Sequence, residues 1–349
     1  MVINLDPIEG NLFSRFTSEG VCSLPAGRVH LTEVQHLEQI SELVGEGAGI
    51  TILDLGSSGG LFFDGQRASR REIRLSGLTI VGAAERSVPM LSIQHAAKAT
   101  LERVEFFGHH DPTGASAAFD VLNSLCQLSR CAFVSNSVAA ILRDGTEVDF
   151  TNCLFEDSGH RAIEKAFVVV ECAMSTAFRY CSFVDGRSDA AILVKSPLTA
   201  SNLLEVNNSV FSGVDIPLWC GTPWRCNVTI QESCFPPSSR ESVERLSLTA
   251  EEKGEMLAER ESGDILVGDR PLNQSPELFL FRDNVLRAIW FRELPHAADG
   301  SGMSLRWGTG TPVVARTPDG PLLDLVGAAR ADRTPIGCIG TLTSVSNLR

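Results

Sequence analysis

The stretch CQLSRCAF at residues 126–133, followed by DFTNCLF at 149–155 and FRYCSF at 178–183, contains one pattern three times. The pattern is an apolar residue, two mostly polar residues, a small or apolar residue, a variable residue and then Phe or Ile. Outward from this centre it recurs until there are seven rows: LSGLTI (75–80), LERVEF (101–106), LSRCAF (128–133), FTNCLF (150–155), FRYCSF (178–183), VNNSVF (206–211) and IQESCF (230–235). Their last residues are 22 to 28 positions apart, which suits one coil of a solenoid.

Each row predicts two short strands joined by a bend. The last two apolar positions alternate as a strand requires, whereas the first gap is three residues long. Gly77, Asn152 and Asn208 stand at the bend, where a left-handed backbone is tolerated. Stacked coils then align like residues into two buried ladders: Leu78, Val104, Cys131, Cys153, Cys181 and Ser209, and Ile80, Phe106, Phe133, Phe155, Phe183, Phe211 and Phe235.

A third strand is expected after each row. The candidates are MLSIQ (90–94), AAFDVL (117–122), AAILR (139–143), AIEKAFVVV (162–170) and AAILVK (190–195). The helical segment and the spacing of a leucine-rich repeat are missing. The sequence therefore predicts an all-β fold, a right-handed parallel β-helix with an N-terminal cap and a C-terminal closing segment.

The chain is expected to divide into four parts. Residues 1–48 form an N-terminal cap or first coil, 49–237 the repeats, 238–264 a charged helix or linker, and 265–349 closing coils and a cap. Thr32–Val44 admits two interpretations, an amphipathic helix or an irregular coil that leads into the strand ITILDL (50–55).

The composition argues against several classes of partner. The 349 residues carry 30 basic and 43 acidic side chains, a formal net charge of −13, and no basic cluster, so nucleic acid is not expected. No segment approaches the ~20 apolar residues that span a bilayer, so no membrane partner is expected either. The amino terminus lacks a secretory signal, which predicts a cytoplasmic protein, or a secreted one if a leader has been removed.

The cysteines are interpreted as core residues. Of the ten, five fall inside the repeats: Cys126, Cys131, Cys153, Cys181 and Cys234. There is no C-x-x-C motif and no Cys/His spacing typical of zinc, so no metal site is predicted.

These residues also support a family resemblance. The L-x-x-C-x-F rows, each followed by a loop and an Ala-Ile pair, resemble the right-handed β-helix repeats of the bacterial pectate-lyase-like superfamily. The segment 24–55 is similar to the usual opening of such proteins. The segment 319–340 is similar to the closing segment of secreted members at Asp324, Gly327 and Arg330, but its PIGCIG end lacks the usual acidic residues. The superfamily includes lyases, hydrolases, epimerases, tailspikes and non-catalytic proteins, so the resemblance implies a fold and does not select an activity.

The resemblance also implies where a substrate would lie. In enzymes of this superfamily it follows the outer face of one sheet, beside the preceding loops, which here are 108–117, 134–139, 156–162 and 184–190. Because neighbouring coils stack ~4.8 Å apart, residues at matching places become neighbours. The candidate catalytic residues are Asp157, His160, Arg161, Asp185, Arg187 and Asp189, and the candidate binding residues are His109, His110, Asp111, Lys195, Trp219 and Trp224.

Two classes of function remain open. The first is the binding or processing of a saccharide, by hydrolysis between paired carboxylates or by a lyase reaction with Arg161 or Lys195 as base. No cofactor is indicated, apart from a calcium ion that a carboxylate pair could hold. The second is a non-catalytic scaffold for a protein partner, in which the loop charges are ordinary turn residues and His109-His110 is a solvated turn. Tyr180, at the bend of its row, is expected at the surface.

Overall fold

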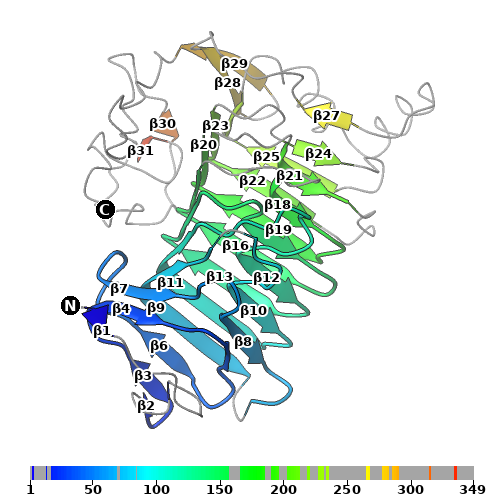
Figure 1. Ribbon diagram of the computed structural model, residues 1–349. Coiled ribbons are helices and arrows are strands. Elements are labelled where there is room, and N and C mark those ends of the chain that lie inside the picture. The colour runs from blue at the N-terminus through cyan, green and yellow to red at the C-terminus, as the bar shows by residue number, and fades with distance from the viewer. Residues whose placement is uncertain are drawn as a thin grey trace.

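The computed structural model confirms a parallel β-solenoid. Successive coils stack along one axis from the amino-terminal end upward (Figure 1). The structure describes, apart from a few isolated positions, residues 17–68, 71–83, 85–156, 166–184, 190–195 and 203–212, together with short strands outside these ranges. In this part of the chain, no helix is long and apolar enough to span a bilayer.

The first two strands of each coil belong to one 20-stranded sheet. In two coils a single long strand runs through the bend: β9 (Glu72–Val81) and β11 (Lys98–Phe107). Elsewhere the first strands are β3 (Val21–Ser23), β6 (Glu42–Val44), β13 (Leu125–Ser129), β16 (Glu147–Thr151), β19 (Ser175–Arg179), β22 (Leu203–Asn207) and β25 (Asn227–Gln231). The second strands are β4 (Gly27–His30), β7 (Thr51–Asp54), β14 (Ala132–Val134), β17 (Leu154–Glu156), β20 (Ser182–Val184), β23 (Val210–Ser212) and β26 (Ser233–Phe235).

A separate nine-stranded sheet contains β27 (Ile265–Val267) and the eight third strands. They are β5 (Val34–His36), β8 (Gly60–Asp64), β10 (Leu91–Gln94), β12 (Phe119–Leu122), β15 (Ala140–Leu142), β18 (Ala166–Val170), β21 (Ala190–Val194) and β24 (Leu218–Cys220). The five third strands expected from the sequence are therefore confirmed.

The pairing is parallel through the repeats and turns antiparallel near both ends of the chain. β2 (Thr17–Ser18) runs antiparallel to β3, whereas β1 (Val2–Ile3) runs parallel to β4. At the other end β27 (Ile265–Val267) pairs antiparallel with β24, and β28 (Glu277–Arg282) pairs with β26 and with β29 (Val285–Trp290). A two-stranded sheet joins β30 (Val314–Ala315) and β31 (Thr334–Pro335). The predicted charged helix at 238–264 lies outside the described residues.

Stacked phenylalanines fill the solenoid as the rows predict. Phe155 stacks between Phe133 at 5.0 Å and Phe183 at 4.6 Å, with interplanar angles of 2° and 5°. A second stack joins Phe150 and Phe178 at 5.0 Å. All five rings are fully buried, so the aromatic ladder is core.

The Cys/Ser ladder satisfies backbone groups at the bend. The thiol of Cys181 donates to the Phe150 carbonyl of the preceding coil at 3.3 Å, and its backbone N–H donates to Ser209 Oγ at 3.1 Å. Cys131 and Cys153 make the same backward contact. Burial raises the pKa of the Cys131 and Cys153 thiols well above the usual range, so both stay protonated and unreactive.

The bend is left-handed in every row that the structure describes there. The backbone φ is 64° at Gly77, 55° at Asn152 and 52° at Asn208, which confirms the expected geometry. Arg103, Arg130 and Tyr180 adopt it too. Tyr180 is only 4% exposed, so its expected surface position is wrong, because the residue lies between the bends of the two neighbouring coils.

The solenoid also extends further toward the amino terminus than the seven rows. Thr32–Val44 contains β5 and β6 and no helix, so the coil interpretation is the right one. The buried residues here are Leu37, Ile40 and Leu43, whereas Val34 is 38% exposed. Parallel pairing of β6 with β3 and β9 satisfies backbone groups of those two strands that a helix at this place would leave unpaired.

Candidate functional site

The outer face of the nine-stranded sheet carries a continuous set of polar and aromatic side chains. Phe62, Ser92 and Asp120 occupy one register across β8, β10 and β12, and Gln94 lies two residues after Ser92 along β10. Their inward neighbours, such as Phe63 and Val121, are fully buried. Together with three charged residues that follow the next strands, they form what we call the outer strip: Phe62, Ser92, Gln94, Asp120, Arg143, Glu171 and Lys195.

Charges of alternating sign link four successive coils of the outer strip. Arg143 donates two hydrogen bonds to the Asp120 carboxylate, from Nε at 2.8 Å and from its second terminal nitrogen at 3.3 Å. Its first terminal nitrogen donates to Glu171 Oε2 at 2.9 Å, and Lys195 Nζ lies 3.2 Å from Glu171 Oε1. The four side chains are between 16% and 35% exposed, so the network faces solvent without being fully solvated.

This network suits binding better than proton transfer. The hydrogen bond to Asp120 raises the pKa of Arg143, which therefore stays charged. Lys195 is paired with a carboxylate, which opposes its predicted role as a base. No three His, Cys, Asp or Glu side chains among the described residues gather as metal ligands would. Asp120 and Glu171 already neutralise cations, so this pair offers little to calcium.

The turn that precedes β12 holds the predicted binding residues His109, His110 and Asp111. His109 is fully buried and its Nε2 lies 2.8 Å from Ser116 Oγ. Asp111, 1% exposed, accepts hydrogen bonds from the Thr113 backbone and hydroxyl and from the Ser116 backbone at 2.7 to 2.8 Å. Burial alone would raise the pKa of Asp111, but these hydrogen bonds outweigh it and lower the pKa.

A solvated turn is therefore the wrong interpretation for His109, and Asp111 is buried beside it. The His109 backbone N–H donates to Asn136 Oδ1 at 2.9 Å, and Asn136 donates to the Phe106 carbonyl at 3.0 Å. These hydrogen bonds attach the turn to the following coil. The His109 imidazole is buried there and has no access to water. The geometry gives both residues a structural role here.

A buried arginine supports the same region from the preceding coil. The Arg86 guanidinium is 0% exposed and donates to the carbonyls of Gly56 at 2.7 Å, Pro89 at 3.1 Å and Gly59. Its backbone N–H donates to the His110 carbonyl at 2.8 Å. Burial lowers the pKa of Arg86 to about 10, which leaves it charged at neutral pH.

His109 makes stability depend on pH. Burial, followed by the nearby Arg86 charge, lowers its pKa to about 4. Because the unfolded chain protonates this histidine at about 6.5, its contribution is complete above that pH and is lost as pH falls toward 4. Between pH 7 and 4.5 we expect wild type to lose about 2–3 kcal/mol more than His109→Gln, as urea unfolding would measure. Parallel losses in both proteins would contradict this origin.

The predicted catalytic residues stay a prediction. Asp157, His160, Arg161, Asp185, Arg187 and Asp189 lie outside the described residues, as does Trp224. The strands that flank them are described: Glu156 pairs with Val184, and Ala166 pairs with Ala190. Trp219 pairs with Leu193 in β24, and its side chain is not described.

The outer strip borders an apolar cluster on the same face. Ile141 and Val169 point outward but are only 3% and 1% exposed, and Leu193 packs against them. Ala117, Val138 and Ala166 complete this second core outside the solenoid. The face is therefore polar along the outer strip and closed by apolar packing beside it.

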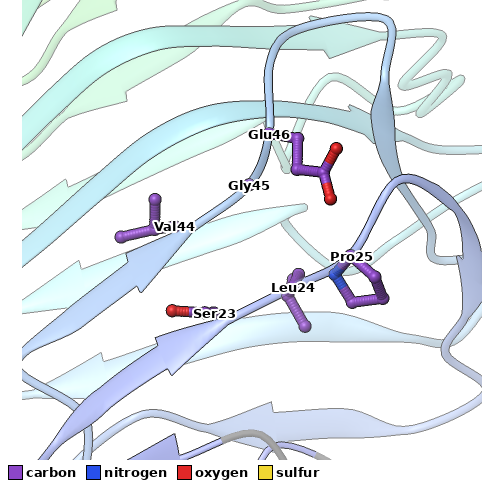
Figure 2. Close-up of a pocket in the computed structure, with 6 residues that line it drawn as sticks. All are labelled: Ser23, Leu24, Pro25, Val44, Gly45 and Glu46. Atoms are coloured by element: carbon purple, nitrogen blue, oxygen red, sulfur yellow. The ribbon is translucent and has the colours of Figure 1, made fainter.

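An open hollow of about 380 Å³ lies at the first coils, lined by Ser23, Leu24, Pro25, Val44, Gly45 and Glu46 (Figure 2). Figure 2 shows Glu46 across from Leu24 and Pro25. The Glu46 carboxylate accepts a hydrogen bond from the Ala26 backbone at 3.2 Å, and Thr51 Oγ1 donates to the Pro25 carbonyl at 3.1 Å. These hydrogen bonds join the turn at residues 25–26 to the loop that begins at Glu46. The polar groups that line the hollow therefore have a structural role.

Sequence reasoning missed Asp120, Arg143, Glu171 and Phe62. Each lies within or just after an ordinary apolar strand, where a single charged or aromatic residue does not by itself indicate a site. Aligning the ends of the third strands would have found the signal, since Leu122, Arg143, Glu171 and Lys195 follow one another in that column.

Comparisons of the chain with protein-family models, with curated proteins and with solved structures found no match.

Proposed function

We propose that this protein is a right-handed β-helix of the pectate-lyase-like type that binds an extended saccharide along the outer strip. The observation that carries the proposal is the network of Asp120, Arg143, Glu171 and Lys195 on four consecutive coils. Hydrogen-bonding groups that ion pairs hold in place on successive coils match the repeat of an extended polymer better than isolated flexible charges do.

An aromatic ring supports the same face. Phe62 is half-buried on the outer strip and contacts His36 edge to face, with ring centroids 5.4 Å apart. A sugar ring can lay its apolar face on such a ring while its hydroxyls reach the partly exposed Asp120 carboxylate two strands away. Binding is the function that these residues support, and cleavage would require the predicted catalytic residues.

Arg143→Ala is the variant that tests the proposal. Removing a charged donor that orders two carboxylates should weaken polysaccharide binding by about tenfold or more. The measurement is retardation in native gels that contain single polysaccharides, neutral and acidic. Arg179→Ala is the matched control, because Arg179 is 39% exposed and bridges Asp149 and Glu205 on the other sheet. Equal losses in both variants would overturn the assignment of the face.

A non-catalytic scaffold is the alternative, and one observation favours it. Phe107 is 43% exposed on the outer face of the 20-stranded sheet, with Val81 and Val134 on the strands at its sides. A protein partner held there would be released by Phe107→Asp and not by Arg143→Ala. A wild-type protein that no polysaccharide retards would favour the scaffold function.

A further inference from the structure

We infer that the outer strip selects uncharged saccharides and rejects polyuronates. This inference rests on the proposed function and specifies its substrate class. A polyuronate carries a carboxylate on each sugar, so binding it requires cations that are not already neutralised. The outer strip has two cations, Arg143 and Lys195, and two carboxylates, Asp120 and Glu171.

Each cation is committed to a carboxylate of this chain. Arg143 holds Asp120 through two nitrogens and Glu171 through a third, and Lys195 lies 3.2 Å from Glu171. The strip therefore has no net charge, and a uronate would have to displace an intramolecular carboxylate to reach either cation. Hydroxyl groups face no such competition, because they can donate to the outer carboxylate lone pairs while the pairs stay intact.

The surroundings strengthen the discrimination. The chain as a whole carries −13, which repels a polyanion at long range. At the amino-terminal end of the same face Arg67 forms an ion pair with Asp64, with 3.3 Å between Arg67 Nε and Asp64 Oδ2. The strands β8, β10, β12 and β15 themselves contain no Lys or Arg that could offset this field.

The double variant Asp120→Asn/Glu171→Gln converts the strip from neutral to basic. It should gain about tenfold in affinity for polygalacturonate at low salt, and the gain should disappear at high salt because the freed cations are screened. The control Asp149→Asn/Glu205→Gln frees Arg179 on the other sheet and changes the net charge equally, so it should gain nothing. Both proteins and wild type are run in gels containing polygalacturonate, galactan or dextran.

The expected wild-type result is retardation by a neutral polysaccharide and none by polygalacturonate. Retardation of wild type by polygalacturonate as strong as by the neutral polymers would overturn the inference and leave the proposed function standing. An equal gain in both double variants would also overturn it, because the effect would then be one of net charge. No retardation of wild type in any gel would overturn the proposed function itself.

Discussion

Phe155→Ala is expected to lower the free energy of unfolding by about 4 kcal/mol. The ring is fully buried and stacked on Phe133 and Phe183, and it also meets Phe150, Phe167 and Phe178 edge to face. The loss combines the buried area, the cavity and the stacking contacts, which together usually cost about 3–5 kcal/mol. Urea unfolding followed by circular dichroism measures it.

Two controls make this result specific. Phe107→Ala removes the same side chain from the same kind of strand, but on the solvent face, and should cost less than about 1 kcal/mol. Phe155→Leu keeps most of the volume and should fall between them. If Phe107→Ala and Phe155→Ala cost the same, the ladder does not hold the coils together.

Arg86→Met is expected to cost about 3 kcal/mol. The substitution keeps an apolar stem of similar length but leaves the carbonyls of Gly56, Gly59 and Pro89 buried without their donor. Each lost hydrogen bond to a charged group costs about 1.5–3 kcal/mol, and relief from burying the charge offsets part of the sum. The melting temperature should fall by roughly 4 °C.

Arg67→Met is the control for this prediction. The Arg67 side chain is 71% exposed and pairs with Asp64 three residues earlier, so its loss should be almost neutral. An Arg86→Met protein as stable as wild type would show that the guanidinium does not hold the turns at 56–59 and 82–90.

The central coils were predictable because one coil repeats the constraints of the next. A residue such as Phe155 sits between like residues, so its row pattern, its burial and its stacking all follow from one alignment. The bend is predictable for the same reason, since it places Gly77 and Asn152 where φ is positive. The burial of Tyr180 was not predicted, because the exposure of a side chain at a bend depends on the neighbouring coils and not on the pattern of its own row.

The amino-terminal coils were hidden by an insertion. Between β6 and β7 the short bend is replaced by the loop Gly45–Ile50, so the spacing of the row is lost. The loop returns by hydrogen bonds from Gly45 to the Ser76 carbonyl and from Gly47 to the Gly77 carbonyl. A Cβ on Gly45 would lie 2.3 Å from the Gly77 oxygen, which explains the glycine.

The candidate site was only partly predictable. Lys195 was found at the end of the expected strand AAILVK (190–195), whereas its partners Arg143 and Glu171 become visible as site residues only when the register of the third strands is known. The burial of Arg86 and His109 has no sequence signal, because both stand in polar, turn-rich segments that usually face water. Contacts between coils, and not local pattern, decide the environment of these residues.

The most direct test of the account is a crystal structure of the protein with an oligosaccharide from the polymer that retards it. We expect sugar rings along the nine-stranded sheet, with one ring on Phe62 and hydroxyls hydrogen-bonded to Asp120 and Arg143. A ligand bound on the 20-stranded sheet, or at the hollow beside Glu46, would contradict it.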